Sequence, residues 1–142
     1  MNKLKYTHLV LLIVVGLVAI FVFFYKLDTI PNGFYVDEAV SGYNSYSLLK
    51  TGKDEYGKTL PIAIRFFASY TPPLYAYVSV LPIYLFGLSE YSTRFISALS
   101  GLFSAVLLYF MMQELGVLTT RHYKLLGVLL FVTCPWVVFY SR

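Results

Sequence analysis

The sequence predicts an all-α, polytopic membrane protein with three to four transmembrane helices and a long extracytoplasmic first loop. Hydrophobic residues make up 58% of the 142 residues and charged residues only 13%, whereas soluble domains carry about a quarter charged residues. The 14 Tyr and 12 Phe fit a protein with many residues at the membrane–water boundary. The net charge of +4 comes without a dense basic run, so nucleic acid is not an expected partner.

The first predicted span covers residues 6–25, in which His8 is the only side chain of a basic or acidic residue. This stretch makes about 30 Å of helix, enough to cross a bilayer core. Lys3 and Lys5 precede it with no acid nearby, so the positive-inside rule places the N-terminus in the cytoplasm. A cleaved signal peptide is the alternative, but the apolar stretch is too long for its usual hydrophobic region.

Residues 26–70 form the predicted extracytoplasmic loop, which holds all but two of the seven acids. Apolar side chains recur there at every third position, with polar residues between them: Val40, Tyr43, Tyr46 and Leu49. This spacing predicts an amphipathic helix on the membrane surface, which ends at Gly52. Residues 60–67 are expected to form a second short interfacial helix.

Three further hydrophobic segments follow, at residues 72–88, 95–113 and 125–141. In the first of them Pro73 suits a helix start and Pro82 should kink the helix. The second is rich in small residues, which allow membrane helices to approach closely.

The sidedness of these segments is ambiguous. Simple alternation places residues 114–124 outside, yet Arg121 and Lys124 in that connection would prefer the cytoplasm. A proline-rich second segment that does not cross fully would remove the conflict.

The acidic pair Asp37 and Glu38 lies just past the first span. An acid before an amphipathic helix is most often an N-cap, and Glu38 would then compensate the helix dipole. The functional alternative is a carboxylate at the membrane face that acts as a general base or metal ligand. One acidic pair is not a complete ligand set for a divalent metal, and use of such a metal is left open. No organic cofactor is expected.

Three arginines lie at expected membrane boundaries: Arg65, Arg94 and Arg142. Each could anchor the chain at the lipid headgroups. Each could also bind a lipid phosphate, for which the guanidinium fork is well suited.

The chain resembles the start of the C-type glycosyltransferases, polytopic enzymes that include protein O-mannosyltransferases and lipid A aminoarabinose transferases. The resemblance is carried by an ordered set of motifs: Pro31-x-x-Phe34-x-x-Asp37-Glu38-Ala39, Leu48-Leu49-x-Thr51-Gly52, Asp54-x-Tyr56-Gly57, Tyr70-x-Pro72-Pro73-Leu74-Tyr75, Leu85-Phe86-Gly87, Arg94-x-x-Ser97-Ala98-Leu99-x-Gly101 and Cys134-Pro135-Trp136 through Ser141-Arg142.

The resemblance implies transfer of a sugar from a polyprenyl-phosphate carrier in the membrane to a protein, lipid or glycan acceptor, with inversion. Asp37 matches the catalytic acid of the family's first outer loop, and Glu38 is its expected helper. The expected ligands of the substrate or lipid phosphate are Tyr56, Arg65, Arg94 and Arg142. Some relatives carry a lysine where Thr71 stands before the prolines, so this part of the phosphate site differs.

The resemblance covers only the N-terminal portion of a family member, and the chain alone is expected to be inactive. The protein is expected in a membrane of the cytoplasmic or endomembrane type. A non-enzymatic small polytopic subunit or an inactive truncated copy are the alternatives. A transport component would need ionisable residues within spans, and the predicted spans have almost none.

Overall fold

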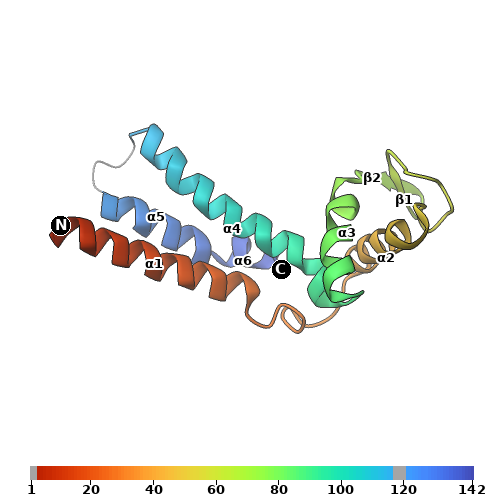
Figure 1. The fold of residues 1–142 in the computed structure, drawn as a ribbon, viewed down its shortest axis with the longest axis horizontal. Coiled ribbons are helices and arrows are strands. Elements are labelled where there is room, and N and C mark those ends of the chain that lie inside the picture. Colours follow the sequence, from red (N-terminus) through yellow and green to blue (C-terminus); the bar gives the residue numbers. More distant parts are fainter. Residues whose placement is uncertain (1–2, 117–120) are drawn as a thin grey trace. The chain divides into compact units, whose positions relative to one another are not determined.

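The computed structural model describes residues 3–116 and 121–142, and the protein is mostly helical (Figure 1). The prediction of a helical protein is therefore confirmed in outline. The elements in chain order are α1 (Lys3–Phe24), α2 (Val36–Thr51), β1 (Ile64–Phe66), β2 (Ser69–Thr71), α3 (Leu74–Phe86), α4 (Glu90–Glu114), α5 (Arg121–Thr133) and α6 (Pro135–Tyr140).

The chain divides into two compact units. The loop unit is Lys26–Ile96 and contains α2, the two strands, α3 and the first residues of α4. The helical unit joins Met1–Tyr25 to Ser97–Arg142 and contains α1, the rest of α4, α5 and α6.

Apolar side chains fill the interior of the helical unit. α1 packs against α5, and small residues let the helices approach. Gly101 of α4 has no room for a side chain, because an added Cβ would lie 2.9 Å from Cβ of Ser141 and 3.2 Å from the Phe23 ring. The buried apolar residues of this unit are Val15, Ala19, Phe23, Ala98, Ala105, Leu125, Val128 and Val132.

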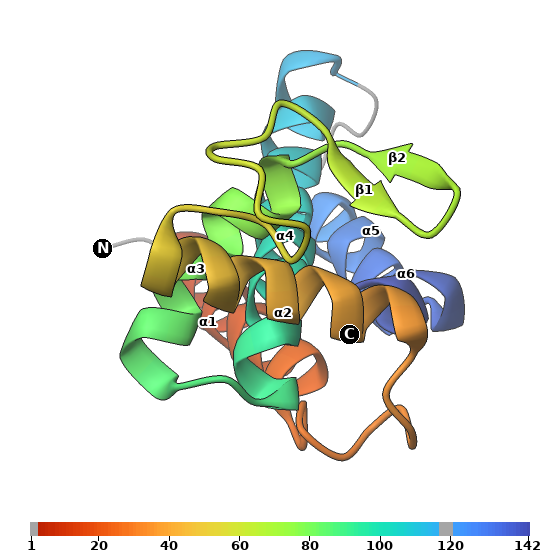
Figure 2. The same ribbon diagram turned by 90° about the vertical axis from the view of Figure 1, so that its right-hand side faces the viewer.

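The loop unit is built around the packing of α2 on α3. Its small apolar core contains Leu48, Ile64 and Ala76, one residue from each of α2, β1 and α3. β1 and β2 pair antiparallel, with Ile64 opposite Thr71 and Phe66 opposite Ser69, and Figure 2 shows this hairpin beside α2 and α3. α2 ends at Gly52, whose φ of 68° is the left-handed value that glycine adopts without strain.

The helix expected at residues 60–67 is wrong, because this segment leads into β1. Phe67 has a φ of 50°, which turns the chain back so that β1 can pair with β2. β-branched Ile62 and Ile64 favour an extended backbone over a helix. The burial of Ile64 in the core of the loop unit decides which face of the strand points inward.

Two helices among the described residues are long and apolar enough to cross a membrane, Tyr6–Phe24 and Glu90–Glu114. Only 17% of the most apolar window of each is buried, unlike the core helix of a soluble protein. These two correspond to the predicted segments 6–25 and 95–113.

The other two predicted segments form shorter helices. Segment 72–88 becomes α3, with Pro73 at its start as expected and Pro82 accommodated inside it. Segment 125–141 is divided into α5 and α6, because Cys134 adopts an extended backbone before Pro135. Neither segment has the roughly 20 helical residues that a perpendicular crossing needs.

Candidate functional site

α2 begins two residues earlier than an Asp37 cap would require. Tyr35 occupies the N-cap position with an extended backbone, and helical residues start at Val36. The Tyr35 N–H donates to Glu38 Oε2 at 3.4 Å, so it is Glu38 that binds the backbone at the helix start. The interpretation of Asp37 as the N-cap is therefore wrong, and both acids lie in the first turn, where they favour the helix dipole.

Glu38 is held by Arg94. The guanidinium Nη2 lies 2.9 Å from Glu38 Oε2, and Nε lies 3.3 Å from both carboxylate oxygens. Arg94 is only 1% exposed and the Glu38 side chain 20% exposed, so the pair is largely screened from water. Glu90 adds a longer contact, at 3.7 Å from Nη1.

Arg94 also fastens the segment that precedes α2. Its Nη1 donates to the carbonyls of Leu27 at 3.2 Å and Pro31 at 3.3 Å, and its Nη2 donates to Gly33 at 2.7 Å. With Glu38, these acceptors account for all five N–H groups of the guanidinium. Arg94 therefore fixes the position of the first turn of α2.

Asp37 has the opposite environment. Its side chain is exposed, and it makes no hydrogen bond or ion pair with any part of the chain that the structure describes. Successive helical residues face different directions, so Asp37 is turned away from Arg94 while Glu38 meets it. The two neighbouring acids are therefore one free carboxylate and one bound carboxylate.

Asp37 lines a cavity of about 220 Å³ in the loop unit. Among the described residues that line it, Asp37 is the only charged one. Its other lining residues come from α2, the hairpin and the start of α3: Val40, Ser41, Ile64, Phe66, Thr71, Pro72, Tyr75 and Ala76.

The walls of this cavity are tied in place by hydrogen bonds. The Tyr75 hydroxyl donates to the Thr93 carbonyl at 2.6 Å, which joins α3 to α4. Thr71 Oγ1 donates to the Ile64 carbonyl at 3.4 Å across the hairpin. Asp37 thus faces a space with fixed walls and hydroxyl groups.

The turn after α2 is organised by buried Asn44. Its Oδ1 accepts from the Glu55 N–H at 3.1 Å, and its Nδ2 donates to the Val40 carbonyl and to Glu55. Asp54 closes the same turn by accepting from the N–H groups of Tyr56 and Lys58. These bonds set where the Tyr56 side chain projects.

Tyr56 and Arg65 are brought together on the surface. The guanidinium carbon of Arg65 lies 4.9 Å from the centre of the Tyr56 ring, and Arg65 Nε donates to the Phe67 carbonyl at 3.1 Å. The terminal nitrogens of Arg65 have no partner among the described residues. This is an exposed guanidinium in a defined orientation.

The sequence-predicted residues therefore fall into separate places. Asp37 lines the cavity, Arg94 and Glu38 form the buried clamp, and Tyr56 with Arg65 forms a surface pair. Arg142 belongs to the helical unit, where its Nη2 donates to the Tyr25 carbonyl.

The cavity contains residues that sequence reasoning missed. Ser41 was not singled out, although it lies one helical turn from Asp37 and so on the same face of α2. Thr71 and Tyr75 were noted only within a motif. Their positions next to the prolines do not predict that they line the same cavity as Asp37, because this proximity depends on how the hairpin packs on α2.

No group of three or more His, Cys, Asp or Glu side chains lies together in residues 3–116 and 121–142. Comparison with known protein families, curated protein sequences and solved structures found no match.

Proposed function

We propose that the chain is the N-terminal portion of a membrane glycosyltransferase that moves a sugar from a polyprenyl-phosphate carrier to an acceptor hydroxyl outside the cytoplasm. The observation that carries the proposal is Asp37, an unpaired carboxylate that lines a cavity at the start of α2. A general base needs a free carboxylate within hydrogen-bond reach of the proton that it removes. Asp37 would take the proton of the acceptor hydroxyl, and the hydroxyl oxygen would attack the anomeric carbon as the lipid phosphate leaves, with inversion.

Glu38 and Arg94 have a positioning role in this proposal. The carboxylate of Glu38 is occupied by Arg94 and by the Tyr35 N–H, so it has little capacity left for substrate. Arg94 is buried and has no spare donor. Together they hold the first turn of α2, and hence the backbone of Asp37, in a fixed place.

The departing phosphate would be stabilised by Arg65. Tyr56 supports its guanidinium plane from one side, and the terminal N–H groups remain free to bind phosphate oxygens in a bidentate manner. Stabilisation of charge that develops on a leaving group is a major term in such reactions.

The proposed topology has α1 and α4 crossing the membrane and α3 remaining on the outer side. In the helical unit His8 of α1 contacts Tyr109 of α4 at 3.2 Å, while Phe23 lies beside Gly101. α1 and α4 are thus antiparallel, and the end of α4 lies on the side where α1 begins. Arg121 and Lys124 would then be cytoplasmic, as the positive-inside rule favours.

This topology can be tested with single cysteines. In a Cys134→Ser background, Glu114→Cys should react with a membrane-impermeant maleimide only after the cells are permeabilised, which gives the reagent access to the cytoplasmic side. Asp28→Cys, on the outer loop, should react in intact cells. Labelling of Glu114→Cys from outside would overturn the topology.

The catalytic assignment is tested by Asp37→Asn in the whole protein as its host expresses it, assayed for transfer of sugar from the lipid-linked donor. Loss of a general base is expected to slow transfer by about 10²–10⁴-fold. Asp28→Asn is the matched control, since it removes another exposed acid of the loop unit that does not line the cavity. Equal transfer by both variants would refute the assignment.

A further inference from the structure

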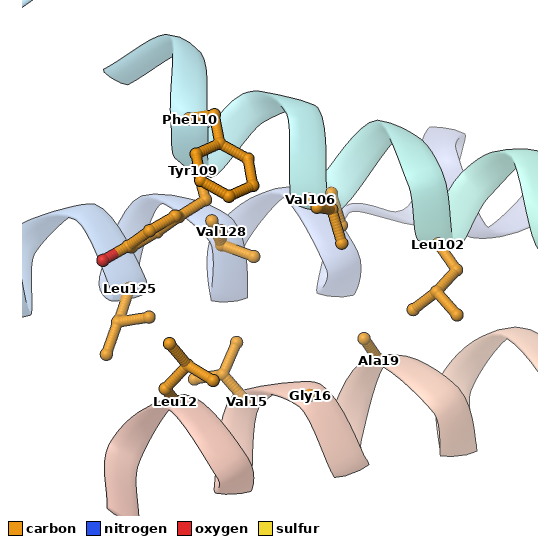
Figure 3. A pocket seen from close by; sticks show the side chains of 11 residues that line it. Leu12, Val15, Gly16, Ala19, Leu102, Val106, Tyr109, Phe110, Leu125 and Val128 are labelled. Atoms are coloured by element: carbon orange, nitrogen blue, oxygen red, sulfur yellow. The ribbon is translucent and has the colours of Figure 1, made fainter. Parts of the chain in front are cut away.

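An apolar groove lies between α1, α4 and α5 of the helical unit (Figure 3). Its volume is about 250 Å³. Figure 3 shows Leu12 and Val15 of α1 facing Tyr109 and Phe110 of α4 across it. The lining residues are Leu12, Val15, Gly16, Ala19, Leu102, Ala105, Val106, Tyr109, Phe110, Leu125 and Val128.

The small residues of α1 leave the groove open. Gly16 lines it, and a Cβ added there would meet no atom within 4 Å. From Leu12 to Ala19 the groove follows α1 over about 10 Å of helix rise. Its volume lies below the range of about 300–1,000 Å³ that is usual for compact ligands, and its course along α1 suits a segment of one extended hydrocarbon chain.

One end of the groove is polar and basic. Tyr109 lines the groove with its ring, and its hydroxyl lies 3.2 Å from His8 Nε2. The His122 ring packs edge-on against His8, with 5.9 Å between centroids. Arg121 is exposed at the start of α5 and has no ion pair within the described part of the chain.

We propose that this groove and its basic end bind one anionic phospholipid, with an acyl chain along α1 and the phosphate at Arg121 and His122. An apolar channel that continues into a cationic end matches a molecule with a hydrocarbon tail and an acidic head. A free cation near a membrane surface attracts anionic lipids. One turn of a transmembrane helix, about 10 Å in diameter and 5.4 Å long, takes up more space than the groove's volume of about 250 Å³. The proposal is independent of the glycosyltransferase assignment.

The experiment uses the whole purified protein in detergent, with bound lipids counted by native mass spectrometry and thermal unfolding followed in parallel. Dioleoyl-phosphatidylglycerol is titrated against dioleoyl-phosphatidylcholine, which has the same chains and no net charge. Inorganic phosphate is a third arm that separates a lipid site from a simple anion site. One phosphatidylglycerol is expected to bind preferentially and to raise the unfolding temperature.

Two variants divide the site into its halves. Gly16→Leu places a large side chain in the groove, at a position where its Cβ meets no atom within 4 Å, and it should abolish binding of both lipids at this site. Arg121→Gln should weaken the binding of phosphatidylglycerol by about fivefold and leave the binding of phosphatidylcholine unchanged. Leu17→Phe is the control, because Leu17 is on the same helix, is 61% exposed and does not line the groove.

Three results would overturn the proposal. One is equal binding of phosphatidylglycerol and phosphatidylcholine by the wild-type protein. The second is stabilisation by inorganic phosphate alone at the level that the lipid gives. The third is lipid binding by Gly16→Leu at the level of Leu17→Phe, which would place the acyl chain elsewhere.

Discussion

The loop unit and the helical unit bury different kinds of side chain. The helical unit buries mostly apolar residues, besides Lys124 and Ser141, whereas the loop unit buries a larger set of polar side chains and one ion pair beside its small apolar core. Hydrogen bonds are directional and fix a geometry, while apolar packing between membrane helices depends on shape. The difference shows that directional contacts hold the polar side chains of the loop unit in a fixed geometry. The buried polar residues of the loop unit are Asn44, Ser45, Asp54, Ser79, Ser92, Thr93 and Arg94.

The largest loss of stability is expected from Arg94→Met, which removes the buried ion pair of the loop unit. The substitution leaves the carboxylate of Glu38 without its counter-ion and three carbonyls without a donor. Removal of one member of a buried ion pair costs about 3–5 kcal/mol of stability. Denaturant unfolding in detergent measures the change, and a loss below about 1 kcal/mol, the size expected of a surface pair, would contradict a polar core.

A substitution of Gly42 tests how closely the loop unit is packed. A Cβ there would lie 2.5 Å from Thr93 Oγ1 and 3.2 Å from Cγ2, so Gly42→Ala should cost about 1–3 kcal/mol in thermal unfolding. Adding Thr93→Ala removes both atoms and should restore part of the stability. Gly16→Ala in the helical unit, where the space is open, should not destabilise the protein. Equal losses of stability at Gly42 and Gly16 would contradict the difference in packing between the two units.

The turn after α2 offers a third comparison. Asn44→Ala leaves the Glu55 N–H without its partner, which should cost about 1–3 kcal/mol and speed proteolysis of residues 53–60. Ser47→Ala is the control on the same helix, since no hydrogen bond of its hydroxyl is seen among the described residues, and it should change stability by less than about 0.5 kcal/mol. Equal protease sensitivity in the two variants would show that Asn44 does not organise the turn.

The smallest effect on stability is expected at Arg65. Arg65→Met removes an exposed cation–π contact with Tyr56, worth about 0.5–1 kcal/mol. Under the proposed function the same change removes a contact to the departing phosphate and should lower kcat/KM for the lipid-linked donor by at least about tenfold. An unchanged kcat/KM would remove Arg65 from the proposed phosphate site.

The long apolar helices were predictable because hydropathy over about 20 residues is a property of the sequence alone. α1, the start of α3 at Pro73 and the end of α2 at Gly52 were confirmed on such local signals. The hairpin at residues 64–71 was not predicted, because a three-residue strand is stabilised by the helices on which it packs. Local sequence cannot specify that packing.

The same limit applies to the site. The local pattern favoured Asp37 as the N-cap, and the resemblance distinguished it as the expected catalytic acid from Glu38 as its helper. The structure supplies the physical difference between the two, because Arg94, 56 residues away in sequence, binds Glu38. A partner that distant leaves no mark in the spacing of the acidic pair.

The proposed division of roles between Asp37 and Glu38 is tested most directly by one paired measurement. Sugar transfer and unfolding temperature are measured for Asp37→Asn and Glu38→Gln. Asp37→Asn should lose about 10²–10⁴-fold in transfer rate and unfold as the wild-type protein does, whereas Glu38→Gln should unfold at a clearly lower temperature. Wild-type transfer by Asp37→Asn, with the protein folded, would contradict the division between a reactive and a positioning carboxylate.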